Sequence, residues 1–220
     1  MTVSIAVIGG GSSMFVPGLV RRLIEIPCFD GAELRLMDID DRRLAVMESL
    51  ATQLVAAEGR KLAVTSKTDR LRALRGVDFV ISAISVGGMA AWANDIEVPA
   101  RYGVFMHIAD SIGPGGIFRA LRNTPVVAAV AREVAEVAPG ALLLNYTNPA
   151  SVNAMAMADY PVRSASLCSC SPMSLNRQWL AGMARARSSV LGVSVSCVCI
   201  CRPYLCADAP ARITTGQGVQ

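Results

Sequence analysis

At 220 residues the chain is long enough to fold around one sizeable hydrophobic core, with part of a second domain. Its formal net charge of +4 is modest, its arginines are scattered and only 5% of its residues are aromatic, so nucleic acid is not an expected partner. Because no apolar run reaches the length of a membrane span and no basic region precedes the first apolar stretch, we expect a cytoplasmic protein with no membrane partner.

The first stretch, residues 3–17, reads as a strand, a tight turn and the start of a helix. In the turn, Gly9 and Gly11 occupy the first two positions of the dinucleotide-binding pattern G-x-G-x-x-G, whereas Met14 stands at the third. Glycines let the backbone approach a pyrophosphate closely, and the N–H groups at the following helix start favour negative charge. The turn alone is equally compatible with an ordinary connection between a strand and a helix.

The second predicted strand ends in an acidic residue. The segment GAELRLMDID places Asp38 after an apolar run, near the position where a Rossmann fold keeps the carboxylate that binds ribose. A carboxylate there accepts hydrogen bonds from the 2′-hydroxyl and repels a 2′-phosphate, which predicts NAD rather than NADP. The alternative is that Asp38 caps the next helix, 41–58, although Asp40 or Asp41 could do so instead.

Strands and helices then alternate along the chain. We expect a helix over 41–58, a strand over 61–65, a short helix over 69–75 and a strand over 77–83. Each strand is apolar along its length, which is typical of a parallel sheet covered by helices on both faces. The predicted fold is therefore α/β, with a doubly wound parallel sheet of the Rossmann type.

Two glycines, Gly87 and Gly88, follow the 77–83 strand at the carboxyl edge of the sheet, where ligands bind in such folds. They could line the nicotinamide side of a cofactor site or form a flexible loop. The next segment, 95–125, is too polar and broken to be expected in the core.

Residues 113–116, which are rich in glycine, lead into a predicted helix that carries Arg119 and Arg122. This arrangement suits an anionic or polyhydroxy ligand at a helix N-terminus, or else it is simply a solvated helix face. The helix is expected to restart at Pro125 and to run to Ala138.

A fifth strand over 141–144 delivers the segment NYTNP to the same edge of the sheet. Asn148 precedes a proline that holds it extended, so its amide can face a ligand rather than its own backbone. A sixth strand over 162–167 would end at Cys168.

From residue 164 onward the composition changes. Asp208 is the only acidic residue among the last 57, lysine is absent, and six of the seven cysteines lie between Cys168 and Cys206. Because no signal peptide is expected, these cysteines are predicted to be thiols. The stretch VSVSCVCICR alternates with period two and could be a strand with its cysteines on one face.

Six motifs follow one another between the N-terminus and about Cys168: IGGGSSMFVPGL, LMDID, DFVISAISVGG, DIEVPARYG, DSIGPGGIFRALRNTP and NYTNPASV. In this order they resemble glycoside hydrolase family 4, the NAD-dependent glycosidases. The family combines a Rossmann domain of the lactate/malate dehydrogenase type with a larger α/β region for substrate binding and dimerisation. The resemblance implies that residues 1–168 are the NAD-binding domain and that residues 169–220 are a truncated or aberrant remnant of the second region. Full-length members are expected to be homo-oligomers.

The resemblance also implies a chemistry. Family members use NAD and a divalent metal, usually manganese, on α- or β-glycosides, some of them 6-phosphorylated. NAD takes a hydride from C3 of the sugar, the resulting ketone acidifies the C2 proton, and the metal holds the C2 and C3 oxygens as a Lewis acid. A base removes the proton, the glycosidic oxygen leaves, water adds and the hydride returns, so no pair of carboxylates is needed.

Motif by motif, the resemblance assigns residues to three roles. The cofactor would be held by Gly9, Gly11, Ser12, Asp38 and Gly87. Asn148 would contact the substrate, and Cys168 would be the thiolate ligand of the metal. Without the resemblance, a cysteine at a strand end is more often a small buried hydrophobe.

The chain departs from the family pattern after Cys168. Ser169 stands where many members have histidine, aspartate or asparagine, and His107, the one histidine, is in the wrong place for the second metal ligand. The catalytic residues are therefore unknown. One hypothesis is a truncated or frameshifted product beyond roughly Ala186, whose activity is open, and the other is a divergent cysteine-rich subdomain.

Two further functions compete with the glycosidase. A dehydrogenase of the lactate/malate type shares the strand-turn-helix start and an Asn-Pro after a strand, but it needs a histidine paired with an aspartate late in the chain, which is missing here. A non-catalytic NAD-binding domain would keep the cofactor and lose the chemistry. The sugar, its anomer and any need for a 6-phosphate are not predicted.

Overall fold

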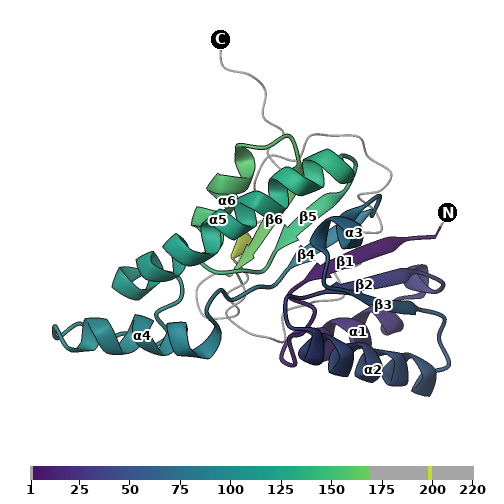
Figure 1. The fold of residues 1–220 in the computed structure, drawn as a ribbon, viewed down its shortest axis with the longest axis horizontal. Coiled ribbons are helices and arrows are strands. Elements are labelled where there is room, and N and C mark those ends of the chain that lie inside the picture. Colours follow the sequence, from purple (N-terminus) through teal and green to yellow (C-terminus); the bar gives the residue numbers. More distant parts are fainter. Residues whose placement is uncertain (1, 169–197, 200–220) are drawn as a thin grey trace, which may run out of the picture.

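The protein is described by a computed structural model over residues 2–168 and 198–199, and its described strands form one parallel sheet (Figure 1). The order of the strands is β3-β2-β1-β4-β5-β6-β7. The sheet therefore grows from β1 toward β3 on one side and from β4 toward β7 on the other, and the strand order reverses between β1 and β4. Their bounds are β1 Ser4–Ile8, β2 Glu33–Met37, β3 Ala63–Lys67, β4 Phe79–Ser82, β5 Leu142–Asn145, β6 Arg163–Cys168 and β7 Val198–Cys199. The predicted doubly wound sheet is confirmed.

Helices cover both faces of the sheet because the strand side chains alternate between them. Ile5 and Val7 of β1 pack with α1 and α2, whereas Ala6 and Ile8 pack with α3, α5 and α6. The helices are α1 Val16–Glu25, α2 Asp41–Ala57, α3 Arg70–Leu74, α4 Gly88–Ala100, α5 Gly113–Val137 and α6 Ala150–Ala158, with a short 3-10 helix at Pro27–Phe29. None of the described helices is both long enough and apolar enough to cross a bilayer.

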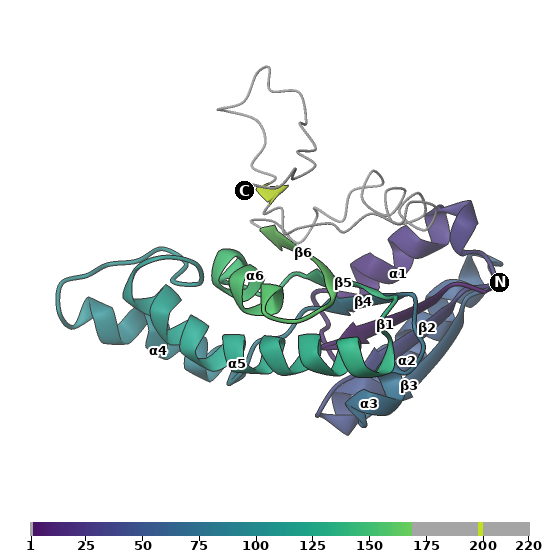
Figure 2. The same cartoon turned by 90° about the horizontal axis from the view of Figure 1, so that it is seen from above.

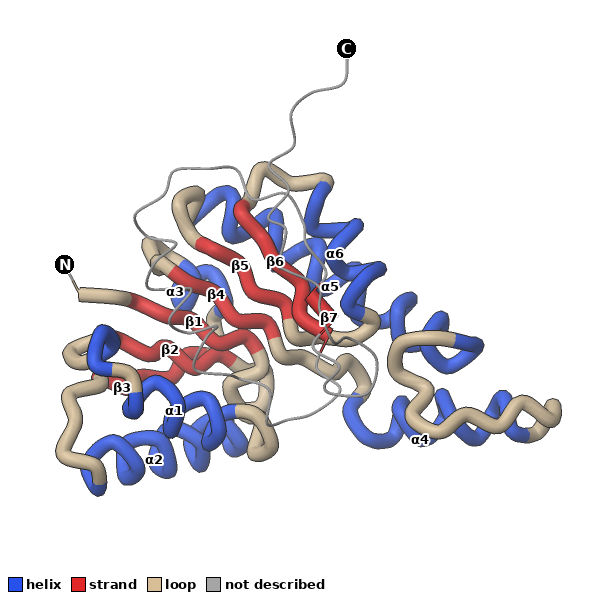
Figure 3. The backbone as a smooth tube through the Cα atoms, turned by 180° about the vertical axis from the view of Figure 1, so that it is seen from behind, coloured by secondary structure: helices blue, strands red, loops and turns tan. Residues whose placement is uncertain are grey.

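Helix α4 and the first turns of α5 project beyond the sheet as an arm, residues 88–121 (Figures 2 and 3). The prediction that residues 95–125 are broken and lie outside the core is confirmed, because residues 101–112 separate α4 from α5 and none of residues 95–125 belongs to the two hydrophobic clusters. The burial of Asp95 was not predicted. Large apolar side chains lie exposed on the arm instead: Met89, Tyr102, Val104, Phe105, Ile108, Ile112, Ile117, Phe118 and Leu121. The arm therefore buries charge and exposes apolar surface.

Helix α5 corrects one prediction, since it passes through Pro125 without a restart. A proline inside a helix removes one backbone donor, here the partner of the Leu121 carbonyl. Pro125 and Leu121 both lie on the exposed side of the helix, where water can satisfy that carbonyl. A single lost hydrogen bond at the surface is tolerated within a helix of 25 residues.

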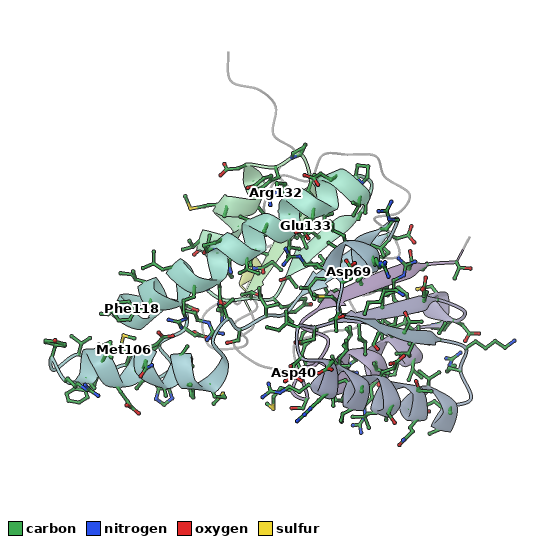
Figure 4. All side chains as sticks on the ribbon, in the orientation of Figure 1. Asp40, Asp69, Met106, Phe118, Arg132 and Glu133 are labelled. Atoms are coloured by element: carbon green, nitrogen blue, oxygen red, sulfur yellow. The ribbon has the colours of Figure 1, made fainter. Side chains whose placement is uncertain are left out.

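Short polar caps start two of the helices on the sheet. The Asp40 carboxylate accepts a hydrogen bond from the Arg43 N–H at the start of α2, and the Asp69 carboxylate accepts one from the Arg72 N–H at the start of α3. Figure 4 shows Asp40 and Asp69 at these two helix starts. Asp40, not Asp38, is therefore the cap of α2, so the alternative that Asp38 serves as this cap is wrong.

Candidate functional site

The candidate site lies at the carboxyl edge of the parallel sheet, beside the reversal between β1 and β4. Four connections meet there: residues 9–15 after β1, 38–40 after β2, 83–87 after β4 and 146–149 after β5. Ligands of doubly wound sheets bind at such a reversal because the two flanking loops part there.

The glycine turn is fastened to the end of β2. The N–H groups of Gly9 and Gly10 both donate to the Met37 carbonyl, at 2.9 and 2.8 Å. Gly9 has φ +96°, and a Cβ there would overlap the Ala83 carbonyl, while a Cβ on Gly10 would lie 2.7 Å from the Met37 nitrogen. The sheet edge leaves no room for side chains at these two positions.

Ser12 ends the turn and orders the start of α1. Its hydroxyl oxygen accepts a hydrogen bond from the Phe15 N–H at 3.2 Å, and its carbonyl accepts one from the Val16 N–H at 3.0 Å. Within the described part of the chain, the N–H groups of Ser13 and Met14 have no acceptor. These donors stand between the glycines and the helix, where an anion would be favoured.

Asp38 faces the glycine turn directly. One carboxylate oxygen, Oδ2, accepts a hydrogen bond from the Gly11 N–H at 2.8 Å, and Oδ1 accepts one from the Asp40 N–H at 3.2 Å. A carboxylate has about four lone-pair positions, so acceptor capacity remains for a further donor. The structure thus brings Gly11 and Asp38, 27 residues apart, into contact.

The loop after β4 contains Gly87, which has φ +79° and forms the N-cap of α4. A Cβ at this position would lie 2.6 Å from the Ala91 side chain and 3.9 Å from Nε of Arg122. Glycine is needed here by the backbone and by its neighbours, so its place in the sequence does not by itself require a ligand.

Asn148 lies in a polar cluster between β5 and the arm. Its Nδ2 donates to Asp110 at 2.7 Å, and its carbonyl accepts hydrogen bonds from Nδ2 of Asn123 at 2.9 Å and from Nε of Arg119 at 3.4 Å. Its Oδ1 is buried and has no partner among the described residues. The amide nitrogen is therefore committed to the protein, and the amide oxygen is the atom left for a ligand.

The two arginines of α5 play different parts. Arg122 donates two hydrogen bonds to Asp95, at 2.8 and 2.5 Å, and these bonds raise the pKa of its guanidinium. Burial lowers the pKa of the Arg119 guanidinium, while the charges of Asp110 and Asp95 oppose that shift. Arg122 is therefore neither free for a ligand nor part of a solvated face. Its ion pair with Asp95 holds α5 to α4.

Tyr146 and Asp110 were missed by the sequence analysis. The Tyr146 ring packs against Phe15 with centroids 5.3 Å apart, which links the β5 loop to the start of α1. Burial raises the pKa of the Tyr146 hydroxyl far above its ordinary value, so the group is neutral at physiological pH. The one local signal for Asp110 was its position just before the glycine-rich start of α5.

The metal prediction falls at the edge of what the structure describes. Cys168 is the last residue of β6, and its backbone lies opposite that of Cys199 in the pairing of β6 with β7. Its side chain and residues 169–197 lie outside the described part. Among the described residues, no three His, Cys, Asp or Glu side chains gather into a potential metal site. Of the strand predicted in VSVSCVCICR, only Val198–Cys199 is described.

Comparison with known proteins places the chain in a family. The sequence model of the family described as family 4 glycosyl hydrolase matches residues 4–178. The α-galactosidase of Rhizobium meliloti (strain 1021) is 39% identical over 166 residues, which cover 74% of this chain and 34% of that relative. The α-glucosidase of Erwinia rhapontici is 37% identical over 152 residues, which cover 69% of this chain and 34% of that relative. The chain thus spans 34% of the length of each of these two relatives.

Solved structures agree with this placement. The 6-phospho-β-glucosidase of Thermotoga maritima, solved with manganese, NAD+ and glucose-6-phosphate, has a TM-score of 0.61 at 30% identity and covers 67% of this chain and 35% of its own. The malate dehydrogenase of Cryptosporidium parvum, at a TM-score of 0.50 and 16% identity over 73% of this chain and 42% of its own, shares the fold alone. On the ordered motifs, the Rossmann-type sheet and the matched family sequence, this chain belongs to the family 4 glycosyl hydrolases.

Proposed function

We propose that this chain is the NAD-binding part of an NAD- and manganese-dependent glycosidase. The observation that carries the proposal is the contact between the glycine turn and Asp38, because it sets a carboxylate with spare acceptor capacity beside a turn that continues into the free N–H groups of Ser13 and Met14. The same arrangement in an ordinary strand-to-helix turn would not need a carboxylate with spare acceptor capacity. Residues 1–168 are proposed as the NAD-binding domain, and residues 169–220 as part of the substrate region.

NAD would be held by Gly9, Gly11, Ser12, Asp38 and Gly87. The unpaired N–H groups at Ser13 and Met14 suit the pyrophosphate, since the start of α1 carries partial positive charge. The free lone pairs of Asp38 suit a ribose hydroxyl, and its negative charge would repel the 2′-phosphate of NADP. When bound, NAD supplies a hydride acceptor that later returns the hydride to the sugar.

On the sugar side, this chain contributes Asn148. Its unpartnered Oδ1 would accept a hydrogen bond from a sugar hydroxyl, while Asp110 holds the amide in place through Nδ2. Cys168, at the end of the neighbouring strand β6, stays the predicted thiolate ligand of manganese. No described residue is assigned as the base that removes the C2 proton.

Three further predictions go with this proposal. A cytoplasmic location, the lack of nucleic-acid partners and homo-oligomers of the full-length protein are expected from the sequence and the family resemblance.

The first test is a calorimetric titration of the chain with NAD+ and with NADP+. We expect NAD+ to bind at least tenfold more tightly, because a charge repulsion of about 1.4 kcal/mol or more separates the two cofactors. A panel of nitrophenyl glycosides and their 6-phosphates, assayed with NAD+, manganese and a reductant, then tests turnover. Binding of NAD+ with no turnover would favour the non-catalytic NAD-binding domain, and no binding of either cofactor would refute the proposal.

Replacing Asp38 with alanine should weaken NAD+ binding about 30-fold, because a hydrogen bond to a charged group contributes about 2 kcal/mol. Asp69→Ala is a matched control, since Asp69 also accepts from a backbone N–H just after a strand but lies at α3. Both variants should lose about 1 kcal/mol of stability in urea, Asp69→Ala because it removes the cap of α3 and Asp38→Ala because it removes hydrogen bonds to the Gly11 and Asp40 N–H groups. An unchanged affinity in Asp38→Ala would refute the ribose assignment.

A further inference from the structure

Asn123 stands in the middle of α5 and contacts two of the loops at the carboxyl edge. Its side chain is 1% exposed. Its Oδ1 accepts a hydrogen bond from the Val86 N–H at 2.9 Å, and its Nδ2 donates to the Asn148 carbonyl at 2.9 Å. One amide group thus connects the loop after β4 with the loop after β5, at positions 37 and 25 residues away in the chain.

We propose that Asn123 is a positioning residue that fixes the cofactor loop, 83–87, and the substrate loop, 146–149, in one relative placement. The inference rests on the proposed function, in which Gly87 borders the nicotinamide and Asn148 contacts the sugar. Hydride transfer between the two ligands depends on that placement, because a displacement of about 1 Å can slow a reaction about 100-fold.

The primary amide satisfies both contacts at once, since it carries an acceptor and a donor. The Val86 N–H donates to Asn123, and the Asn148 carbonyl accepts its shorter hydrogen bond from Asn123, at 2.9 Å, beside a longer one from Nε of Arg119 at 3.4 Å. A buried backbone group that loses such a partner is destabilising. An ionised aspartate supplies the acceptor, has no donor and adds a buried negative charge, whereas alanine supplies neither contact. The two substitutions therefore separate the two contacts.

The neighbours of Asn123 hold other parts of the same region. Arg122 pairs with Asp95 of α4, and Thr124 donates through Oγ1 to Asn153 of α6 at 2.9 Å. Asn153 in turn donates to the Thr147 carbonyl at 2.8 Å. Residues 122–124 thus fasten α4, α6 and both loops to one helix, and Asn123 is the member of the three that bonds directly to both loops.

The experiment compares Asn123→Ala and Asn123→Asp with Glu133→Gln in the full chain. Glu133 lies on the same helix as Asn123, away from the loops, and forms an ion pair with Arg70 of α3 (Figure 4), so its variant reports a general loss of stability. Hydrogen exchange is measured by mass spectrometry, and NAD+ affinity by calorimetry. Asn123→Ala should lose exchange protection in both loops and bind NAD+ about tenfold more weakly, as for one net hydrogen bond.

Asn123→Asp keeps the acceptor for the Val86 N–H but buries a negative charge beside the Asn148 carbonyl, so it should lose more exchange protection around Asn148 than around Val86. Glu133→Gln should change neither loop relative to the rest of the fold. If both Asn123 variants match Glu133→Gln in loop exchange, the positioning role is wrong. If Asn123→Ala does not fold, the same comparison is made with Asn123→Asp alone. If the unmodified chain does not bind NAD+, the proposed function fails, and the exchange data still decide the role of Asn123.

Discussion

Replacing Arg122 with methionine should lower the free energy of unfolding by about 3–5 kcal/mol, because it leaves a buried carboxylate without its cation. Asp95 is 1% exposed and receives both hydrogen bonds of the Arg122 guanidinium. Water cannot reach the carboxylate to replace those bonds unless the arm opens. Urea denaturation followed by circular dichroism measures the loss, with the slope of the transition checked for two-state behaviour.

Two controls make the expected loss specific to burial. Arg22→Met removes a cation from an exposed pair with Glu25, whose side chains are 37% and 41% exposed, and should cause a much smaller change. The double variant Arg122→Met with Asp95→Asn should be more stable than Arg122→Met alone, since no uncompensated charge stays buried. A loss in Arg122→Met no larger than that in Arg22→Met would show that the ion pair does not hold the arm.

Much of the fold could be predicted because its signals are local. The helix predicted over 41–58 is α2 Asp41–Ala57, and Asp40 caps it through a residue three positions away. The predicted strand at 61–65 lies two residues early against β3 Ala63–Lys67, as expected where a strand has only partly buried side chains. Apolar runs, caps and glycines act over a few residues, so a single sequence contains them.

The buried polar contacts of the arm were not predicted because they join residues far apart in the chain. Asp95 and Arg122 are 27 positions apart, and Asp110 meets Asn148 across 38 positions. No spacing rule connects such pairs, so polar residues that are buried in pairs look like a solvated segment in the sequence. For the same reason Arg122 could be read as a ligand or as surface, but not as the partner of Asp95.

The candidate site divides in the same way. Gly9, Gly11 and Asp38 follow a pattern whose spacing reflects the geometry of strand, turn and helix, and the structure brings them together. Asn123 and Tyr146 carry no such pattern, because each acts by packing or bonding to loops that the chain brings together only on folding. The roles assigned to these residues toward NAD and substrate stay predictions.

Replacing Gly9 with alanine should lower the free energy of unfolding by about 4 kcal/mol, from two causes that can be separated. At φ +96° an alanine carries left-handed strain of about 1–2 kcal/mol. Its Cβ would also overlap the Ala83 carbonyl at the end of β4, and relieving such overpacking costs about 1–3 kcal/mol. Because β1 and β4 flank the reversal, the strands would part where NAD is proposed to bind.

Gly31→Ala separates the two causes, since Gly31 has φ +80° but open space around its Cβ position. It should lose only the conformational part, about 1–2 kcal/mol in urea, and keep NAD+ affinity unchanged. Gly9→Ala should lose more stability and also bind NAD+ more weakly, because the turn that presents the Gly11 N–H to Asp38 is displaced with it. Equal losses of stability in the two variants would mean that β1 and β4 can part without cost. The close approach of the turn to Ala83 would then not determine the shape of the site.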